Sequence, residues 1–350
     1  MNKPTIALIT DEYGIYSGGR YYIHQVIKAI NQLDYNLIVI INKDQPSKED
    51  FKDYGSHQQI IFKDISKVDI EADLYIGTPQ AGASMAMKLG KKYVKPSMVM
   101  VFDSLPLLKK YYPKDVETEI TVKESFFEQI EESDTNLLVL AEANRTSILE
   151  DGWLNKREDQ IFSLSPCVNE KVMKQVPEQE KEDIIIMTSR MVPRKNFPQA
   201  ITVLKGLDKK YKLYIISNNL SPEVENTIRS FNLQDRIKLF SHITDLEKFE
   251  LLKKSKAAIN TSFFEGFGMF ITEARACGVP IVVNDFPVFR EIKKKSKDDG
   301  IYLAKRNDDF DFTKILRKAL NKEHKPVNYY NFNRFKKEVK DILECLTWRC

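Results

Sequence analysis

The sequence predicts an α/β protein made of two doubly wound domains, each built on a parallel sheet. Short apolar runs rich in β-branched residues alternate with helical stretches along the 350 residues. This length corresponds to two domains of roughly 150 to 200 residues, and 42% apolar residues are enough for two cores. Continuous apolar strands joined by helices indicate parallel sheets that are covered on both faces.

Ten apolar runs are expected to be strands, five in each half of the chain. Those of the first half are Thr5–Thr10, Leu37–Ile41, Leu74–Gly77, Ser97–Phe102 and Leu137–Ala141, with helices at Gly19–Leu33 and Val116–Glu132. Those of the second half are Ile184–Thr188, Leu213–Ser217, Ile237–Phe240, Ala257–Asn260 and Pro280–Val283. A last helix is expected from Phe332 to Trp348, because Phe335, Val339, Ile342 and Leu346 form one apolar stripe.

The boundary between the two domains is expected in the segment Ser165–Asp183. This segment contains two prolines and many charges without sustained periodicity, which is typical of a hinge. We therefore expect an N-terminal domain at 1–165 and a C-terminal domain at 166–330.

Charge is divided unevenly between these domains. Residues 1–165 carry 19 Lys and Arg against 25 Asp and Glu, a net charge of −6, whereas residues 166–350 carry 35 against 25, a net of +10. A basic C-terminal half suits an anionic ligand such as a diphosphate, and equally an anionic membrane or nucleic acid. The cluster Lys109, Lys110, Tyr111, Tyr112 and Lys114 is open to two interpretations, a solvated face or a contact with a lipid-linked acceptor.

Cysteine spacing indicates neither a zinc site nor a disulfide framework. Cys167, Cys277, Cys345 and Cys350 show no CxxC pair, so we expect reduced thiols in a cytoplasmic chain and no metal. No apolar run reaches the ~18 residues of a membrane span, and the N-terminus lacks the apolar core of a signal peptide.

The segment from Ser262 to Val283 carries the strongest functional signal. It holds two carboxylates, Glu265 and Glu273, eight positions apart around a Gly-Phe-Gly loop and a short helix expected at Met269–Cys277. Glycines let the main chain approach a ligand, and unpaired amides at a helix N-terminus favour a phosphate. Each glutamate can accept hydrogen bonds from hydroxyls on either side of that phosphate.

A second segment supplies positive charge at the end of a predicted strand. After Ile184–Thr188 the chain continues Ser-Arg-Met-Val-Pro-Arg-Lys, which places Arg190, Arg194 and Lys195 there. Ligands of open α/β sheets collect outside the carboxyl ends of the strands. These cations can therefore neutralise a diphosphate leaving group.

Together these segments resemble the retaining glycosyltransferases of the GT-B fold, in particular glycosyltransferase family four. Glu265 and Glu273 match its Glu-x7-Glu motif, and Arg190 with Lys195 its Arg/Lys pair. Gly18-Gly19 is similar to its amino-terminal glycine loop, and Ser241–Asp245 to its nucleotide-side loop. The resemblance implies two Rossmann-like domains facing each other across a cleft, with the helix at 331–350 packing back on the first domain.

The resemblance also implies a role for each matching residue. Glu265 would contact the transferring sugar, Glu273 the ribose, and Arg190 with Lys195 the departing diphosphate. Phe102–Pro106 resembles a family loop in which many members carry a His before the Asp, and here Phe102 stands in place of that His. Asp103 either orients the acceptor hydroxyl or makes a capping or turn contact. The donor-binding residues expected in all are Gly18, Gly19, Ile243, Gly266, Phe267, Gly268, Met269, Phe270 and Glu273.

The expected function is transfer of a sugar, with retention of configuration, from a UDP-, GDP- or ADP-linked donor to a hydroxyl of a glycan, glycolipid or protein glycan. We expect no cofactor, no metal and no nucleic acid partner. Peripheral contact with the inner face of the membrane and homo-oligomerisation stay open. Two other functions that would use the same donor site also stay open: that of a GT-B sugar-nucleotide epimerase or phosphorolytic enzyme, and that of a catalytically silent partner subunit. No GxGxxG motif and no P-loop indicates a dehydrogenase or an NTPase.

Overall fold

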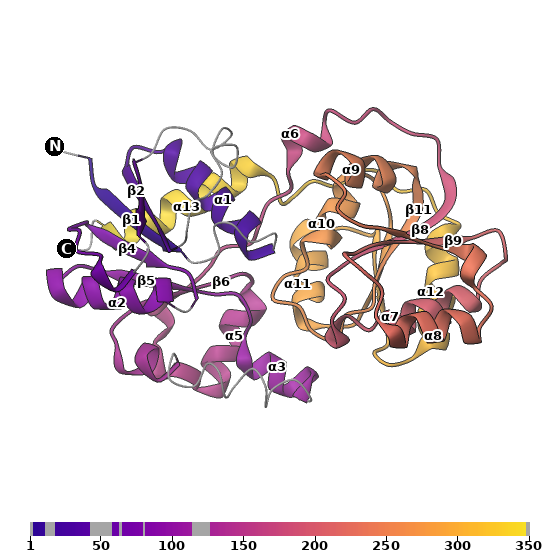
Figure 1. Ribbon diagram of the computed structural model, residues 1–350, viewed down its shortest axis with the longest axis horizontal. Coiled ribbons are helices and arrows are strands. Elements are labelled where there is room, and N and C mark those ends of the chain that lie inside the picture. Colours follow the sequence, from indigo (N-terminus) through magenta and orange to yellow (C-terminus); the bar gives the residue numbers. More distant parts are fainter. Residues whose placement is uncertain are drawn as a thin grey trace. The chain divides into compact units, whose positions relative to one another are not determined.

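The chain folds into two compact units. The computed structural model describes residues 3–10, 18–42, 58–62, 65–79, 81–113 and 127–347. One unit comprises Met1–Pro166 together with Asn333–Cys350, and the other comprises Cys167–Phe332. Each unit has its own sheet (Figure 1).

The first unit is built on a seven-stranded sheet whose paired strands all run parallel. Its strand order is β3-β2-β1-β4-β5-β6-β7. The strands are β1 (Thr5–Thr10), β2 (Asn36–Asn42), β3 (Gln58–Phe62), β4 (Leu74–Gly77), β5 (Ser97–Val101), β6 (Asn136–Val139) and β7 (Ile161–Ser163). The helices are α1 (Gly18–Asn31), α2 (Ala81–Tyr93), α3 (Leu105–Tyr111), α5 (Glu142–Asp151) and α13 (Phe332–Thr347).

Helix α13 packs beside α1 on one face of this sheet (Figure 1). Its apolar stripe, with Phe335 and Val339 buried, covers strand residues such as Met98. The Phe335 ring meets Tyr22 of α1 edge to face, with ring centroids 6.0 Å apart. The apolar periodicity of the last helix thus binds it to the first unit, although the whole second unit lies between them in sequence.

The second unit is built on a six-stranded parallel sheet of order β10-β9-β8-β11-β12-β13. The strands are β8 (Glu182–Thr188), β9 (Lys212–Ile216), β10 (Ile237–Phe240), β11 (Ser255–Asn260), β12 (Ile281–Asn284) and β13 (Ile301–Ala304). The helices are α6 (Glu170–Met173), α7 (Phe197–Lys205), α8 (Pro222–Ser230), α9 (Asp245–Lys254), α10 (Met269–Ala276), α11 (Pro287–Ser296) and α12 (Asp309–Leu320).

The core of the second unit lies between the sheet and three helices. Side chains of α7, α8 and α12, among them Phe197, Val224 and Phe312, pack on strand residues such as Ile185 and Leu213. Helices α9, α10 and α11 lie on the other side of the strands (Figure 1). A sheet buried on both faces requires continuous apolar strands, which is the pattern of β8 and β12.

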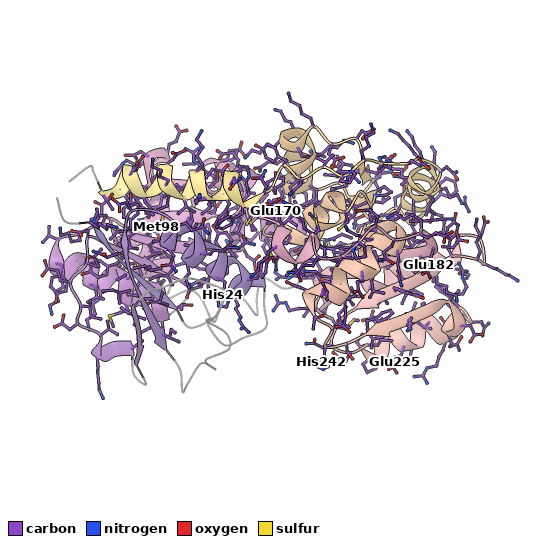
Figure 2. All side chains as sticks on the ribbon, turned by 90° about the horizontal axis from the view of Figure 1, so that it is seen from above. His24, Met98, Glu170, Glu182, Glu225 and His242 are labelled. Carbon is purple, nitrogen blue, oxygen red and sulfur yellow. The ribbon has the colours of Figure 1, made fainter. Side chains whose placement is uncertain are left out.

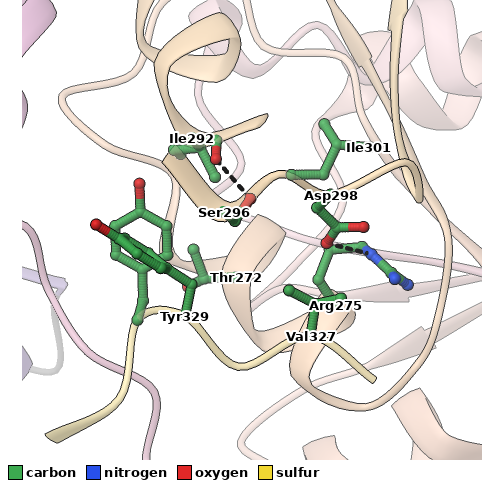
Figure 3. A pocket seen from close by; sticks show the side chains of 9 residues that line it. Thr272, Arg275, Ile292, Ser296, Asp298, Ile301, Val327 and Tyr329 are labelled. Carbon is green, nitrogen blue, oxygen red and sulfur yellow. Dashed lines mark hydrogen bonds and ion pairs between the residues drawn. The ribbon is translucent and has the colours of Figure 1, made fainter. Parts of the chain in front are cut away.

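A fully buried ion pair fixes the last turn of α10. Arg275 Nε donates to Asp298 Oδ2 at 2.7 Å, and the two side chains are 2% and 0% exposed (Figure 3). Arg275 Nη2 also donates to the carbonyl of Lys325 at 2.9 Å. Gly300 is required beside this pair, because a Cβ there would lie 2.3 Å from Arg275 Cζ. Helix α10 is therefore anchored at the end opposite to its glycine loop.

The ten predicted strands all occur, each within two residues of the expected ends. Three further strands, β3, β7 and β13, were not predicted. The predicted helix Val116–Glu132 is helical from 127 to 132. Lys114, Trp348, Cys350 and the remainder of that helix lie outside the described residues. Within the described ranges, no helix combines the length and the apolar character that crossing a bilayer requires.

Candidate active site

Two loops meet in the second unit at the point where its strand order reverses. Strands β8 and β11 are neighbours and run parallel, so their carboxyl ends lie side by side. The chain continues from β8 into the basic segment and from β11 into the Glu-Gly-Phe-Gly segment. A reversal of strand order opens a crevice at the carboxyl edge of an α/β sheet. Both predicted motifs therefore lie at one end of one sheet.

The basic loop places its three cations differently. Arg190 is exposed and makes no side-chain hydrogen bond or ion pair with any described residue. The 3₁₀ turn Pro193–Lys195 buries Arg194 and Lys195, which are 8% and 6% exposed. The guanidinium of Arg194 lies 5.7 Å from the centre of the Phe264 ring. Of the predicted pair, Arg190 is thus exposed at the strand end and Lys195 is buried. Arg194, which the sequence analysis also placed there, is buried as well.

Lys195 and Glu265 form a direct ion pair between the two loops. Lys195 Nζ lies 2.6 Å from Glu265 Oε2. Glu265 Oε1 accepts hydrogen bonds from Ser262 Oγ at 2.8 Å and from Asn260 Nδ2 at 3.3 Å. Burial alone would raise the pKa of Glu265, but the charge and hydrogen bond of Lys195, aided by Arg194, hold that pKa below its ordinary value. The carboxylate is therefore ionised and fixed at both oxygens.

The glycine loop leads into α10 through a left-handed residue. Gly268 is the N-cap of the helix with φ 93° and ψ 58°, a conformation that residues with a Cβ rarely adopt. Gly266 and Phe267 are buried, and the Phe267 ring lies edge to face against Tyr330 with centroids 5.2 Å apart. The helix begins at Met269, and Phe270 in its first turn is buried. Its first amides are the donors that an anion would meet.

Glu273 is held by a lysine that the sequence analysis did not select. Lys248 Nζ of α9 lies 2.8 Å from Glu273 Oε1 and 3.0 Å from Asp245 Oδ1. Burial would lower the pKa of Lys248, but the two carboxylates raise it above its ordinary value. Lys248 and Glu273 are 25 positions apart in the sequence. Because α9 also carries other lysines, no local sequence signal distinguishes Lys248 from them.

The loop before α9 places Ile243 next to a well-formed cap. Thr244 is the N-cap of α9 and forms a capping box with Glu247. His242 has a left-handed backbone with φ 54° and an exposed side chain at the edge of the second unit (Figure 2), and Ile243 is partly buried. The cap fixes where this loop ends.

The remaining predicted residues belong to the first unit. Gly18 and Gly19 open α1, and the loop before them lies outside the described residues. Asp103 follows β5 and precedes Ser104, which occupies the N-cap position of α3 without a side-chain capping hydrogen bond. Phe102 packs its ring edge to face on Tyr22, with centroids 6.0 Å apart. Among the described residues, no group of three His, Cys, Asp or Glu side chains is placed to hold a metal ion.

Solved structures with this architecture define the class. Alr3699/HepE of Anabaena in complex with UDP and glucose has a TM-score of 0.79 at 14% identity, covering 98% of this chain and 100% of its own. WaaG, a glycosyltransferase involved in lipopolysaccharide biosynthesis, has a TM-score of 0.64 at 10% identity, covering 98% of each chain. The two sheets and their helices therefore form the GT-B fold, as the sequence predicted.

Sequence comparison adds a family match in the second unit. Residues 168–335 match the family model described as Glycosyl transferases group 1. The serotype-specific mannosyltransferase WbdA of Escherichia coli is 31% identical over 116 residues, which are 31% of this chain and 14% of WbdA. The O-antigen chain mannosyltransferase RfbU of Salmonella typhimurium is 27% identical over 119 residues, 33% of this chain and 34% of RfbU. The chain thus spans about a seventh to a third of the length of these relatives.

Proposed function

We propose that the protein is a retaining glycosyltransferase that moves a sugar from a nucleotide-diphosphate donor to an acceptor hydroxyl. The observation that carries this proposal is the buried Lys195–Glu265 pair at the carboxyl edge of β8 and β11, beside the first amides of α10. The family match at residues 168–335 covers both of these loops. A cation and a helix N-terminus can bind a diphosphate, and a carboxylate can accept hydrogen bonds from sugar hydroxyls.

Each group then has a defined task. The amides before Phe270 and the ammonium of Lys195, with Arg190 or Arg194, take up the charge that develops on the diphosphate. Glu265 accepts hydrogen bonds from the sugar hydroxyls, and Glu273 from those of the ribose. The bond from the anomeric carbon to the diphosphate oxygen breaks with its electron pair on that oxygen. The acceptor oxygen bonds to the same face of the sugar, and its proton passes to the departing phosphate.

The acceptor proposed is a hydroxyl of a glycan or of a lipid-linked glycan. WbdA and RfbU, whose names describe them as a serotype-specific and an O-antigen chain mannosyltransferase, support a carbohydrate acceptor. HepE, solved with UDP-glucose, supports a nucleotide sugar as donor. Asp103, which follows β5 in the first unit, is the residue proposed to orient the acceptor hydroxyl.

A thermal-shift panel of UDP-glucose, GDP-mannose and ADP-glucose tests the donor proposal. A donor present at about 100 times its Kd adds about 2.7 kcal/mol to the free energy of unfolding, so one class of donor should raise the melting temperature. The best donor is then incubated with and without glycan acceptors, and products are analysed by NMR. Retention of the anomeric configuration is expected. An inverted product contradicts the retaining mechanism, an epimerised donor indicates the epimerase, and the absence of both transfer and donor hydrolysis indicates a silent subunit.

A further inference from the structure

The ammonium of Lys248 lies at the centre of a chain of polar contacts that ends at Glu273. Asn169 Nδ2 donates to Asp245 Oδ2 at 3.2 Å, and Asp245 Oδ1 lies 3.0 Å from Lys248 Nζ. Lys248 Nζ in turn donates to Glu273 Oε1 at 2.8 Å. Four residues from the segment before α6, from α9 and from α10 are thus joined within the second unit.

This chain leaves one oxygen of Glu273 available. The Lys248 and Glu273 side chains are 16% and 8% exposed, so both charges are largely removed from water. Lys248 takes Oε1, whereas Oε2 of Glu273 has no hydrogen-bond or ionic partner in the part of the chain that the structure describes. Oε2 is not among the fully buried side-chain atoms that lack a partner, so water, or a ligand hydroxyl in its place, can reach it.

We infer that Lys248 is a positioning residue for Glu273. The inference rests on the proposed function and names a residue that acts through another. Burial raises the pKa of Glu273, and the charge and hydrogen bond of Lys248 oppose that rise. By binding Oε1, Lys248 also fixes the orientation of the carboxylate. Oε2 then accepts hydrogen bonds from the ribose hydroxyls of the donor. Asp245 and Asn169 restrict the Lys248 side chain in turn.

The same helix provides a matched control. Lys253 of α9 is also buried, 8% exposed, and its Nζ donates to the carbonyl of Val176 at 2.7 Å and to Glu178 Oε1 at 3.0 Å. It shares the helix and the charge of Lys248, and its side chain is 10% exposed against 16% for Lys248, but it makes no hydrogen bond or ion pair with Glu273. Loss of Lys253 therefore reports the cost of removing a buried lysine from α9 without touching the ribose contact.

The experiment compares nucleoside diphosphates that differ only in the ribose. Calorimetric Kd values are measured for UDP, GDP and ADP and for the 2′,3′-dideoxy form of each. The proteins compared are the wild type, Lys248→Met, Lys248→Arg and Lys253→Met. The wild type should prefer the ribose form of its nucleotide by about 10- to 100-fold, because hydrogen bonds to a charged acceptor are lost in the dideoxy form. In Lys248→Met that preference should fall about tenfold while the dideoxy Kd stays unchanged. Lys248→Arg should restore part of it, and Lys253→Met should keep the wild-type preference.

Several outcomes would overturn the inference. If Lys248→Met weakens the binding of the ribose and dideoxy nucleotides equally, then Lys248 only stabilises the fold. The same conclusion follows if Lys253→Met reduces the preference for the ribose form as much as Lys248→Met does. Should Lys248→Met fail to fold, Asp245→Asn provides the same comparison, because it keeps the Lys248 ammonium but removes the charge that restricts it. An unchanged preference of Asp245→Asn for the ribose form over the dideoxy form refutes the inference. If the wild type binds none of UDP, GDP and ADP, the proposed function itself fails. If it binds one of them without a ribose preference, only the inference fails.

Discussion

Lys195 and Glu265 show how two residues far apart in sequence satisfy each other at the end of a sheet. Each is largely buried, and each would be costly to bury alone, because an isolated charge loses its hydration. Their separation of 2.6 Å and the hydroxyl of Ser262 offset that cost. The pair is therefore both a structural contact and a charge held in place for an anionic ligand.

Replacement of Lys195 by Met should abolish most of the activity. The variant keeps the aliphatic stem and removes the charge that we assign to the leaving diphosphate, and loss of one such contact costs about 10²- to 10³-fold in kcat. Turnover is measured with the donor selected by thermal shift, and Lys209→Ala, at an exposed lysine of the same unit, serves as control. A Lys195→Met enzyme within a few-fold of the wild type would refute the leaving-group assignment.

Replacement of Lys195 by Met should also make the loss of unfolding free energy depend on pH. In the wild type the pKa of Glu265 is held low, so its stabilising contribution is lost only as pH falls through that lowered value. Without Lys195, burial raises the pKa of Glu265 above its unfolded value, so the folded variant gains protons and relative stability as pH falls toward about 4.3. Urea unfolding should show a deficit of about 3 kcal/mol near neutral pH that narrows by about pH 5. A deficit that is constant with pH would contradict this assignment.

At this scale the sequence predicted residue types better than pairings. The Glu-x7-Glu spacing selected Glu265 and Glu273 because glycines and carboxylates at fixed offsets form a local pattern. Which cations of the basic loop are buried depends on how the turn at Pro193 folds, and the sequence pattern does not contain that information. Lys248 was missed because its partner lies on another helix.

At the scale of elements, α10 is held at both ends. The buried Arg275–Asp298 pair fixes its last turn, and Gly268 sets the angle at which the chain enters its first turn. A Cβ on Gly268 would lie 3.1 Å from Ile271 Cδ1 and 3.1 Å from Phe289 Cε1. Both the positive φ and the close neighbours therefore demand glycine at this position.

Gly268→Ala should impair turnover more than stability. Left-handed backbone costs a residue with a Cβ about 1 to 2 kcal/mol, and displacement of the loop by about 1 Å can lower turnover by about 100-fold. Gly152→Ala is the matched control, because Gly152 also has a positive φ, 68°, but has no atom within 4 Å of an added Cβ. Both variants should lose stability in urea, Gly268→Ala somewhat more because its Cβ meets Ile271 and Phe289, and only Gly268→Ala should lose activity. Equal activity in the two would show that the loop tolerates the shift.

The strands that the sequence did not reveal share one property. β3, β7 and β13 each lie at an edge of a sheet, where one side of the strand has no neighbour. Such strands need less apolar surface and are often short; Ile161–Ser163 has only three residues. The central strands are covered by helices on both faces and must be apolar throughout. Nine of the ten predicted strands are central, and the tenth, β10, lies at an edge of its sheet.

At the scale of the whole molecule, the chain passes from one unit to the other twice, and the two passages are tied together. Val168 donates its backbone N–H to the carbonyl of Tyr330 at 2.8 Å. Glu170, labelled in Figure 2, accepts hydrogen bonds from Asn328 Nδ2 at 2.9 Å and from the amide of Phe332 at 3.2 Å. The outgoing and returning segments thus leave the second unit side by side.

Loss of the Phe335 ring should destabilise the first unit alone. This ring is fully buried against Tyr22, and truncation of a buried Phe to Ala costs about 3 to 5 kcal/mol. Differential scanning calorimetry of Phe335→Ala should show one transition at lower temperature and the other unchanged. Lys340→Ala, at an exposed position of the same helix, should change stability by no more than about 0.5 kcal/mol. A shift of both transitions together would show that the units unfold as one.

The nesting of one unit within the other sets the order of events on the ribosome. All of Cys167–Phe332 is synthesised before α13, which at cellular rates takes roughly 10 to 30 s. At the end of that interval the second unit has all of its strands, β8 to β13, whereas the nascent first unit still exposes the apolar surface that α13 will cover. The part of the chain that is made first is therefore the last to mature.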